Sequence, residues 1–143
     1  MQSVIEPIKR SLLKAELTTD KLLRRTNKSN NEIYIITAHD SPAVMQEIGR
    51  LRENAFRYYG GGTGKPVDID EFDVMPDAYR QLIVWNPEDE QILGGYRFLC
   101  GSDVRLDESG KPVLATSHLF DFSEQFTKDY LPFTVELGRS FVA

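Results

Sequence analysis

Four charged residues of this 143-residue chain stand beside apolar residues: Arg52, Arg97, Glu136 and Arg139. A charge in such surroundings is costly unless an opposite charge pairs with it. We therefore expect the three arginines to join carboxylates in one interlocked network. Such a network is either a set of structural ion pairs or a site that binds an amine and offers a carboxylate as proton acceptor.

Three aspartates between residues 68 and 73 supply further carboxylates. Asp68, Asp70 and Asp73 stand at positions i, i+2 and i+5. In extended backbone, Asp68 and Asp70 point to the same side while Ile69 faces inward. The stretch lacks the glycine and the distal glutamate of an EF-hand loop. We therefore expect these carboxylates to hold an ammonium or guanidinium group rather than calcium.

The glycine-rich segment GGGTGKP (60–66) invites comparison with a P-loop, G-x-x-x-x-G-K-[ST]. Tyr59 occupies the place of the first glycine, and Pro66 occupies the place of the hydroxyl residue. The segment also follows a predicted helix, whereas a P-loop follows a strand. We expect a flexible connection or lid here, with no phosphate site.

The residue types give little support for a metal site or for a catalytic cysteine. Cys100 is the single cysteine, and neither His39 nor His118 stands near it or at a metal-ligand spacing. We therefore expect no metal site. A lone cysteine excludes an intrachain disulfide and favours a reducing compartment. With neither a signal peptide nor an apolar run of ~20 residues in view, we expect a cytoplasmic protein.

Composition indicates one ordinary globular domain, with 41% hydrophobic and 27% charged residues. A net charge of −5 argues against nucleic acid, because phosphate binding needs a concentrated cationic face. A small basic cluster, Lys21 to Lys28, belongs to an amphipathic N-terminal arm. We expect this arm to pack on the core. The alternative is peripheral contact with a membrane, at its inner face, or with an acidic carrier.

The elements that must position these residues follow from periodicity. Residues 1–30 are predicted to form a helical arm whose second short helix covers 20–27. A strand is predicted at 32–38. A long helix follows, with Ser41 as its cap, Pro42 in its first turn and its end at Gly60.

The second half of the chain is predicted to be richer in strands. Two strands, 80–85 and 91–99, are separated by a turn and form a hairpin. A helix at 121–131 precedes a last strand at 133–142. Strands beside helices in this order indicate an α+β fold with a mixed, mostly antiparallel sheet, and we assign residues 31–143 to this domain.

Four motifs in this order carry a family resemblance: LRENAF (51–56), DIDEFD (68–73), GGYRFL (94–99) and VELGRSFV (135–142). The set resembles the GNAT-fold N-acyltransferases that make ornithine and glycine lipids, a group that often bears a historical haemolysin label. It also resembles the acyl-homoserine-lactone synthases. The resemblance covers residues 32–142 and implies a GNAT-like acyltransferase fold.

The resemblance also implies roles for individual residues. Glu136 corresponds to a general base, and Asp70 and Asp73 would orient the acceptor amine and the arginines. Three arginines match the substrate-binding positions of the network: Arg52, Arg97 and Arg139. Two aromatic residues, Phe56 and Trp85, are candidates for the acyl pocket or simply for the core.

The implied reaction is direct acyl transfer with no permanently bound cofactor. The donor would be an acyl-carrier-protein or coenzyme A thioester, and the acceptor would be the amine of a small amino acid. In the family, a helix that holds the donor's phosphate follows the strand matching VELGRSFV (135–142). The chain ends at Ala143, so we expect a fold that is truncated at its C-terminus, with an exposed sheet edge that favours homo-oligomers.

Two alternative functions stay open at this level. One is an acyl-homoserine-lactone-type signal synthase, although such synthases usually carry a tryptophan before the acidic stretch, where this chain has GGGTGKPVD (60–68). The other is a non-catalytic or incomplete GNAT half that acts as a binding module and keeps only structural ion pairs.

Overall fold

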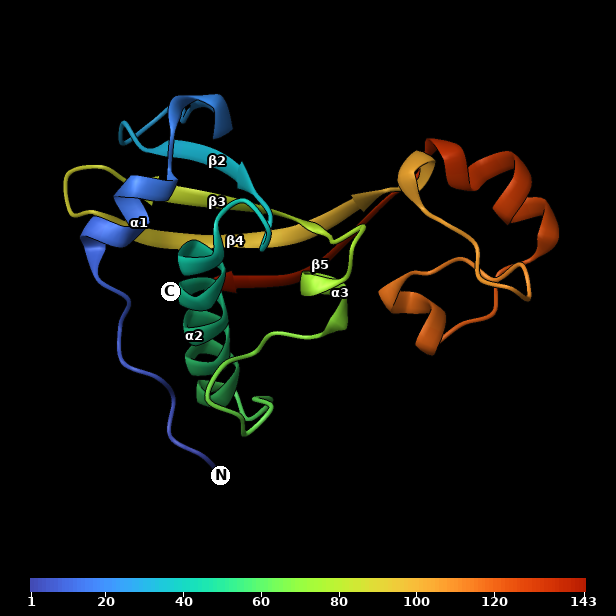
Figure 1. Cartoon of the computed structure of the whole chain (residues 1–143), viewed down its shortest axis with the longest axis horizontal. Coiled ribbons are helices and arrows are strands. Elements are labelled where there is room, and N and C mark those ends of the chain that lie inside the picture. The colour runs from blue at the N-terminus through green and yellow to red at the C-terminus, as the bar shows by residue number, and fades with distance from the viewer. The chain divides into compact units, whose positions relative to one another are not determined.

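A computed structural model describes all residues, 1–143, and shows one five-stranded sheet with helices (Figure 1). The strands lie in the order of the chain: β1 (Leu22–Arg25), β2 (Glu32–Ile36), β3 (Arg80–Asn86), β4 (Gln91–Cys100) and β5 (Val135–Val142). β2 pairs antiparallel with both β1 and β3. The α-helices are α1 (Arg10–Glu16), α2 (Pro42–Tyr58) and α3 (Glu71–Val74). The predicted α+β class is confirmed.

The chain divides into two compact units, whose boundaries fall within β4 and β5. The first unit comprises Met1–Arg97 with Arg139–Ala143, and the second comprises Phe98–Gly138. None of the helices combines the length and the apolar character that crossing a membrane requires.

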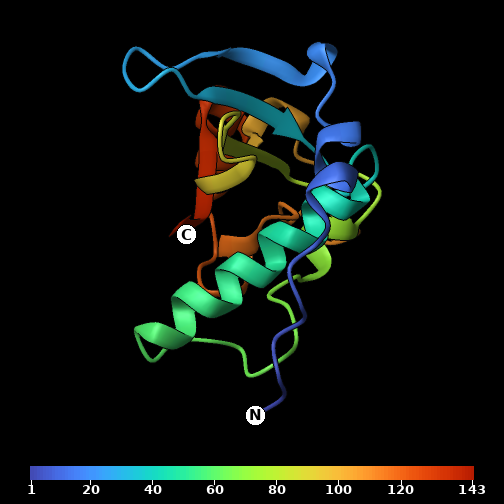
Figure 2. The same ribbon diagram turned by 90° about the vertical axis from the view of Figure 1, so that its left-hand side faces the viewer.

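The core of the first unit lies between α2 and one face of the sheet (Figures 1 and 2). Apolar residues of α2 recur at helical spacing, so that one stripe of the helix is buried. This stripe meets alternate residues of the strands, since every second side chain of a strand points to the same face. The fully buried members include Ile36, Val44, Met45, Ile48 and Ile83.

Both ends of α2 agree with the prediction, but the cap at its start differs. Pro42 begins the helix, and Gly60, with a φ of 80°, follows its end. Ser41 makes no side-chain capping bond. Instead, the carboxylate of Glu16 accepts hydrogen bonds from the amides of Ala43 (3.1 Å) and Val44 (2.8 Å). A carboxylate at this position satisfies free amides and complements the helix dipole.

The N-terminal arm is less helical than predicted. Residues 2 and 5 donate backbone hydrogen bonds to Gly64 and Pro66, and α1 begins only at Arg10. The predicted second helix over 20–27 is wrong, because Leu22–Arg25 forms strand β1. Pairing with β2 gives these residues backbone partners that a short isolated helix could not match.

The second unit contains short helical turns rather than long elements. These are η2 (Gly101–Asp103), η3 (Ala115–His118), the π-helix η4 (Phe126–Tyr130) and η5 (Leu131–Phe133). The helix predicted at 121–131 corresponds to helical turns over 124–133. Along them the Phe126 ring stacks on Phe122, with centroids 5.2 Å apart, and on Tyr130, with centroids 6.5 Å apart.

Candidate active site

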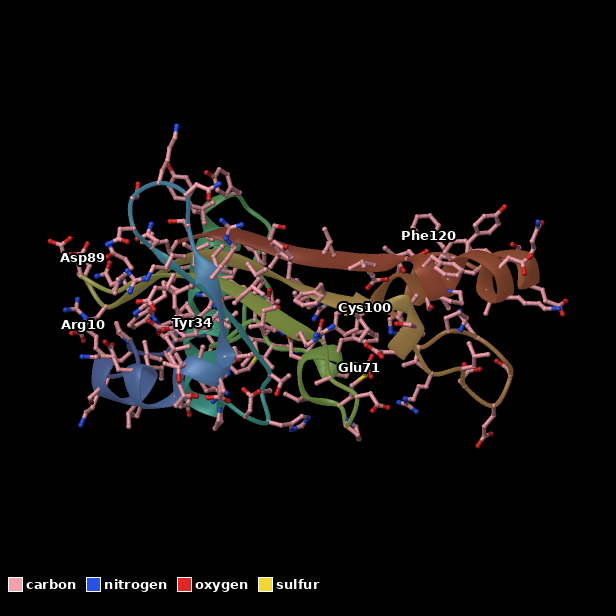
Figure 3. The ribbon with its side chains drawn as sticks, turned by 90° about the horizontal axis from the view of Figure 1, so that it is seen from above. Arg10, Tyr34, Glu71, Asp89, Cys100 and Phe120 are labelled. Carbon is pink, nitrogen blue, oxygen red and sulfur yellow. The ribbon has the colours of Figure 1, made fainter.

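The short helix α3 places two of the predicted aspartates through its first turn. Asp70 is the N-cap residue, and its side chain accepts a hydrogen bond from the amide of Phe72 (3.0 Å). The Asp73 carboxylate reaches back to the amide of Asp70 (3.1 Å), which completes a capping box. The turn therefore fixes both carboxylates relative to the backbone. In Figure 3, Glu71 labels this helix.

Arg52 of α2 is completely buried and bonded to this turn. Its Nη1 lies 3.0 Å from Asp73 Oδ2 and 3.3 Å from the carbonyl oxygen of Asp68. Its Nη2 donates to Gln81 Oε1 on β3 (2.6 Å), and Gln81 in turn donates to Asp73 Oδ1 (2.8 Å). Arg52, Asp73 and Gln81 thus form a closed triangle of hydrogen bonds with almost no exposed surface. These hydrogen bonds allow the ion pair to be buried, although the Nε of Arg52 has no hydrogen-bond partner.

Arg97 of β4 joins the same cluster from another side. Its Nη1 lies 2.6 Å from Asp70 Oδ1 and 3.3 Å from Asp73 Oδ1. The guanidinium also lies over the rings of Phe72 and Tyr79, at 5.7 Å and 5.1 Å from their centroids. These cation–π distances indicate that the aromatic rings stabilise a charge that water does not reach.

Arg139 of β5 closes the network at its partly exposed rim. Its Nη1 lies 3.2 Å from Asp68 Oδ2, and its Nη2 lies 3.3 Å from Asp70 Oδ2. As predicted, Asp68 and Asp70 therefore present their carboxylates to the same side. The backbone of Arg139 has a φ of 52° inside a strand. A non-glycine residue rarely adopts this conformation, which tends to persist at functional sites where the surroundings hold it in place.

The pKa values of two aspartates in the network, Asp68 and Asp70, are shifted in opposite directions. Burial disfavours the charge on Asp70, but the hydrogen bond from Arg97 and the charges of Arg97 and Arg139 outweigh it and lower the pKa to about 2. Burial raises the pKa of Asp68, although Arg139 and Arg52 offset part of this rise. Asp70 is therefore a fixed anion across the physiological range. It pairs with a cation readily and accepts a proton poorly.

Glu136 lies on β5 within the second unit. Its Oε2 accepts a hydrogen bond from the Thr116 hydroxyl (2.5 Å) and a longer one from the Thr116 amide (3.4 Å). Glu136 and Arg139 belong to the same strand, three positions apart.

The two aromatic candidates lie in different surroundings. Trp85 is buried in the core cluster of the first unit. Phe56 packs against this cluster and also lines a pocket of about 650 Å³ beside the end of β5. Phe56 therefore borders open space that a ligand could enter.

Sequence reasoning did not identify Gln81 or Glu53. Gln81 carries no charge, and its place in the triangle depends on β3 lying beside α2. Glu53 is buried, and its carboxylate accepts bonds from Thr63, Gly64 and Arg57, with distances from 2.7 to 3.0 Å. The glycine-rich segment that we expected to be flexible is thus tied to Glu53. The sequence feature that could have revealed this role is the position of an acidic residue, Glu53, on the buried stripe of α2.

Comparison with known proteins gives a consistent result. Residues 51–143 match the family described as "Acetyltransferase (GNAT) domain". A "Glycine N(alpha)-acyltransferase" from Phocaeicola vulgatus is 68% identical over 142 residues, which is 99% of this chain and 44% of the relative. A protein of the same name from Bacteroides thetaiotaomicron is 66% identical over 142 residues, 99% of this chain and 42% of the relative. The chain spans less than half the length of these relatives. No solved structure matches it.

Proposed function

The chain belongs to the GNAT acetyltransferase family, and from this membership we propose that it transfers an acyl group from a thioester to the α-amine of glycine. The observation that carries the proposal is the 68% identity, over 99% of the chain, with a protein named glycine N(alpha)-acyltransferase. At this identity we expect the pocket chemistry of the shared region to be retained. The chain covers 44% of that relative, so the activity is a proposal that the experiment below tests.

The rim of the ion network supports an amino-acid acceptor. Glycine is a zwitterion, with an ammonium and a carboxylate separated by one carbon. Asp70 and Arg139 present one charge of each sign at the surface, with side chains 29% and 35% exposed. We assign Asp70 to hold the ammonium before reaction and Arg139 to bind the carboxylate, since an arginine fork matches a carboxylate.

The buried members of the network receive positioning roles. Arg52 and Asp73 have no exposed surface, so we assign both a positioning role, in place of the substrate contact predicted for Arg52. Arg97 is nearly as buried and acts by holding Asp70. Preorganised charges of this kind keep the rim residues in place without cost during the reaction.

Glu136 is the proposed general base. The acceptor must lose a proton from its ammonium group before its nitrogen has a lone pair. The amine then attacks the thioester carbonyl, the new C–N bond forms, and the C–S bond breaks. The thiol leaves with a proton, and the product is an N-acylglycine. The donor is an acyl thioester of coenzyme A or of an acyl-carrier protein, since both present the same reacting group.

The test is product formation by the full-length protein and its Glu136→Gln variant. With glycine and an acyl-CoA or acyl-carrier-protein donor, mass spectrometry should detect N-acylglycine. Glu136→Gln should lower kcat roughly 10²- to 10⁴-fold, the usual contribution of a general base. Glu124→Gln, an exposed change in the same unit, is the matched control. Unchanged turnover in Glu136→Gln would remove this residue as the base, and an N-acyl homoserine lactone as product would contradict the acceptor.

A further inference from the structure

The second unit, Phe98–Gly138, contains a pocket of its own, of about 220 Å³. Six apolar residues contribute to its wall: Leu99, Leu114, Phe122, Phe126, Leu131 and Val135. The pocket is larger than the ~150 Å³ apolar cavity that stays dry and accepts benzene. A hydrocarbon group therefore fits it by size and by character.

The polar side chains that border this pocket are already engaged. The Thr116 hydroxyl donates to Glu136, and the Thr134 hydroxyl donates to the carbonyl oxygen of Tyr130 (2.8 Å). Neither hydroxyl proton is free for a ligand. A ligand in this pocket gains mainly from apolar burial, which favours a hydrocarbon chain over a charged or strongly polar molecule.

Glu136 is the third polar residue of the wall. If it is the base, the acyl carbonyl must come close to it during the reaction. No aspartate or glutamate lines the larger pocket, which Phe56 borders. Its walls include Tyr58 and Tyr59, both largely exposed. The smaller pocket therefore combines an apolar wall with the proposed reactive group.

We propose that the pocket of the Phe98–Gly138 unit binds the hydrocarbon chain of the acyl donor and sets the preferred chain length. This assignment rests on the proposed acyl transfer for its biological meaning. Val135 is the residue through which selectivity can be changed most simply, because it lines the pocket and is half exposed at the start of β5.

The experiment measures binding rather than turnover. Wild-type protein is titrated, without glycine, with S-acyl-N-acetylcysteamine thioesters whose straight chains run from two to ten carbons. Each added methylene should tighten binding roughly fourfold until the pocket is full, the factor that corresponds to ~0.8 kcal/mol per buried methylene. NMR should show contacts between the chain and the rings of Phe122 and Phe126.

Three tryptophan variants locate the chain. With Val135→Trp, the increase in affinity per added methylene should stop at a shorter chain length. The affinity for the longest thioester should fall about tenfold. Leu137→Trp is the matched control, since Leu137 is exposed on the same strand and does not line the pocket. Ala55→Trp occupies the larger pocket instead. Neither control should change the dependence on chain length.

The outcomes separate this proposal from the proposed function. No gain with chain length, no contact to the two rings, or an effect of Ala55→Trp in place of Val135→Trp would each overturn the pocket assignment. The ring contacts decide the question even if Val135→Trp fails to fold. A protein that binds the thioesters in this pocket but transfers nothing to glycine would contradict the proposed function and leave the assignment standing.

Discussion

The two units of the chain differ in how much charge they bury and in how often they expose large apolar side chains. In the first unit, Arg52, Asp73, Gln81 and Glu53 are almost completely buried. Hydrogen bonds satisfy the carboxylates of Asp73 and Glu53 and the amide of Gln81. The second unit exposes large apolar side chains more often, seven among its 41 residues against eight among the 102 residues of the first unit. One of the seven is Phe120, which projects away from the ribbon in Figure 3. The others are Leu106, Leu119, Tyr130, Phe133, Val135 and Leu137.

This difference indicates where rigidity resides. A buried ion network permits few arrangements, because every displacement leaves a charge unpaired. The second unit buries only three large apolar residues, Leu99, Leu114 and Leu131. The second unit therefore has little apolar core of its own. The molecule thus combines buried, paired charges, which suit the proposed small polar acceptor, with exposed apolar surface, which suits the proposed acyl chain.

The largest effect should follow from breaking the buried triangle. Arg52→Ala leaves Asp73 as a buried anion without its main partner, and we expect a loss of about 3–5 kcal/mol in the free energy of unfolding. Urea denaturation measures this loss. Lys111→Ala, which removes an exposed ion pair with Asp121 in the second unit, should leave the midpoint unchanged. A loss below about 1 kcal/mol for Arg52→Ala would show that the triangle is not what makes the first unit rigid.

Glu53 should give an intermediate effect that depends on pH. Burial opposes its charge, but hydrogen bonds from Thr63, Arg57 and Gly64 lower its pKa from 4.5 to about 2. The stabilisation of the folded state that this lowered pKa provides is fully present above pH 4.5 and is lost as the pH falls towards 2. Glu53→Gln should therefore cost roughly 2–3 kcal/mol at pH 7.

The pH dependence of stability in the Glu53→Gln variant tests whether the Glu53 carboxylate is the group responsible. Urea midpoints measured between pH 4.5 and 3 should fall less steeply for Glu53→Gln than for wild type. Asp70, whose pKa is also about 2, still titrates in both proteins, so some slope remains. Parallel profiles would mean that Glu53 does not hold the 60–65 loop in solution.

The smallest effect on stability should come from the apolar surface of the second unit. Phe133 is 90% exposed and Phe120 is 62% exposed. Replacing each with serine should change the free energy of unfolding by no more than about 0.5 kcal/mol. Phe141→Ala, in the core of the first unit, should cost about 3–5 kcal/mol and is the contrasting control. Sedimentation velocity should show less self-association in the serine variants, since exposed apolar patches promote contact.

An appreciable loss of stability in either serine variant would contradict this interpretation. It would mean that Phe120 or Phe133 is covered in solution. The second unit would then expose fewer apolar side chains in solution, and the contrast between the two units would be smaller.

Local patterns predicted the elements whose signals lie within a few residues. The long helix α2, its proline start, its end at Gly60, the β3–β4 hairpin and the last strand all have such signals, and each is confirmed. The N-terminal residues 20–27 have an ambiguous apolar pattern, so their pairing with β2 could not be predicted. The same holds for Glu16, whose capping of α2 joins residues 27 and 28 positions apart.

The sequence by itself determined that Asp68 and Asp70 share a side, because alternate residues of extended backbone do so. It also determined that buried arginines and aspartates must pair, since an unpaired buried charge is too costly. Only the tertiary structure decided the pairs. Arg139 reaches Asp68 across 71 residues, and Arg52 reaches Gln81 across 29. Those choices depend on how the strands and α2 pack, which no local pattern specifies.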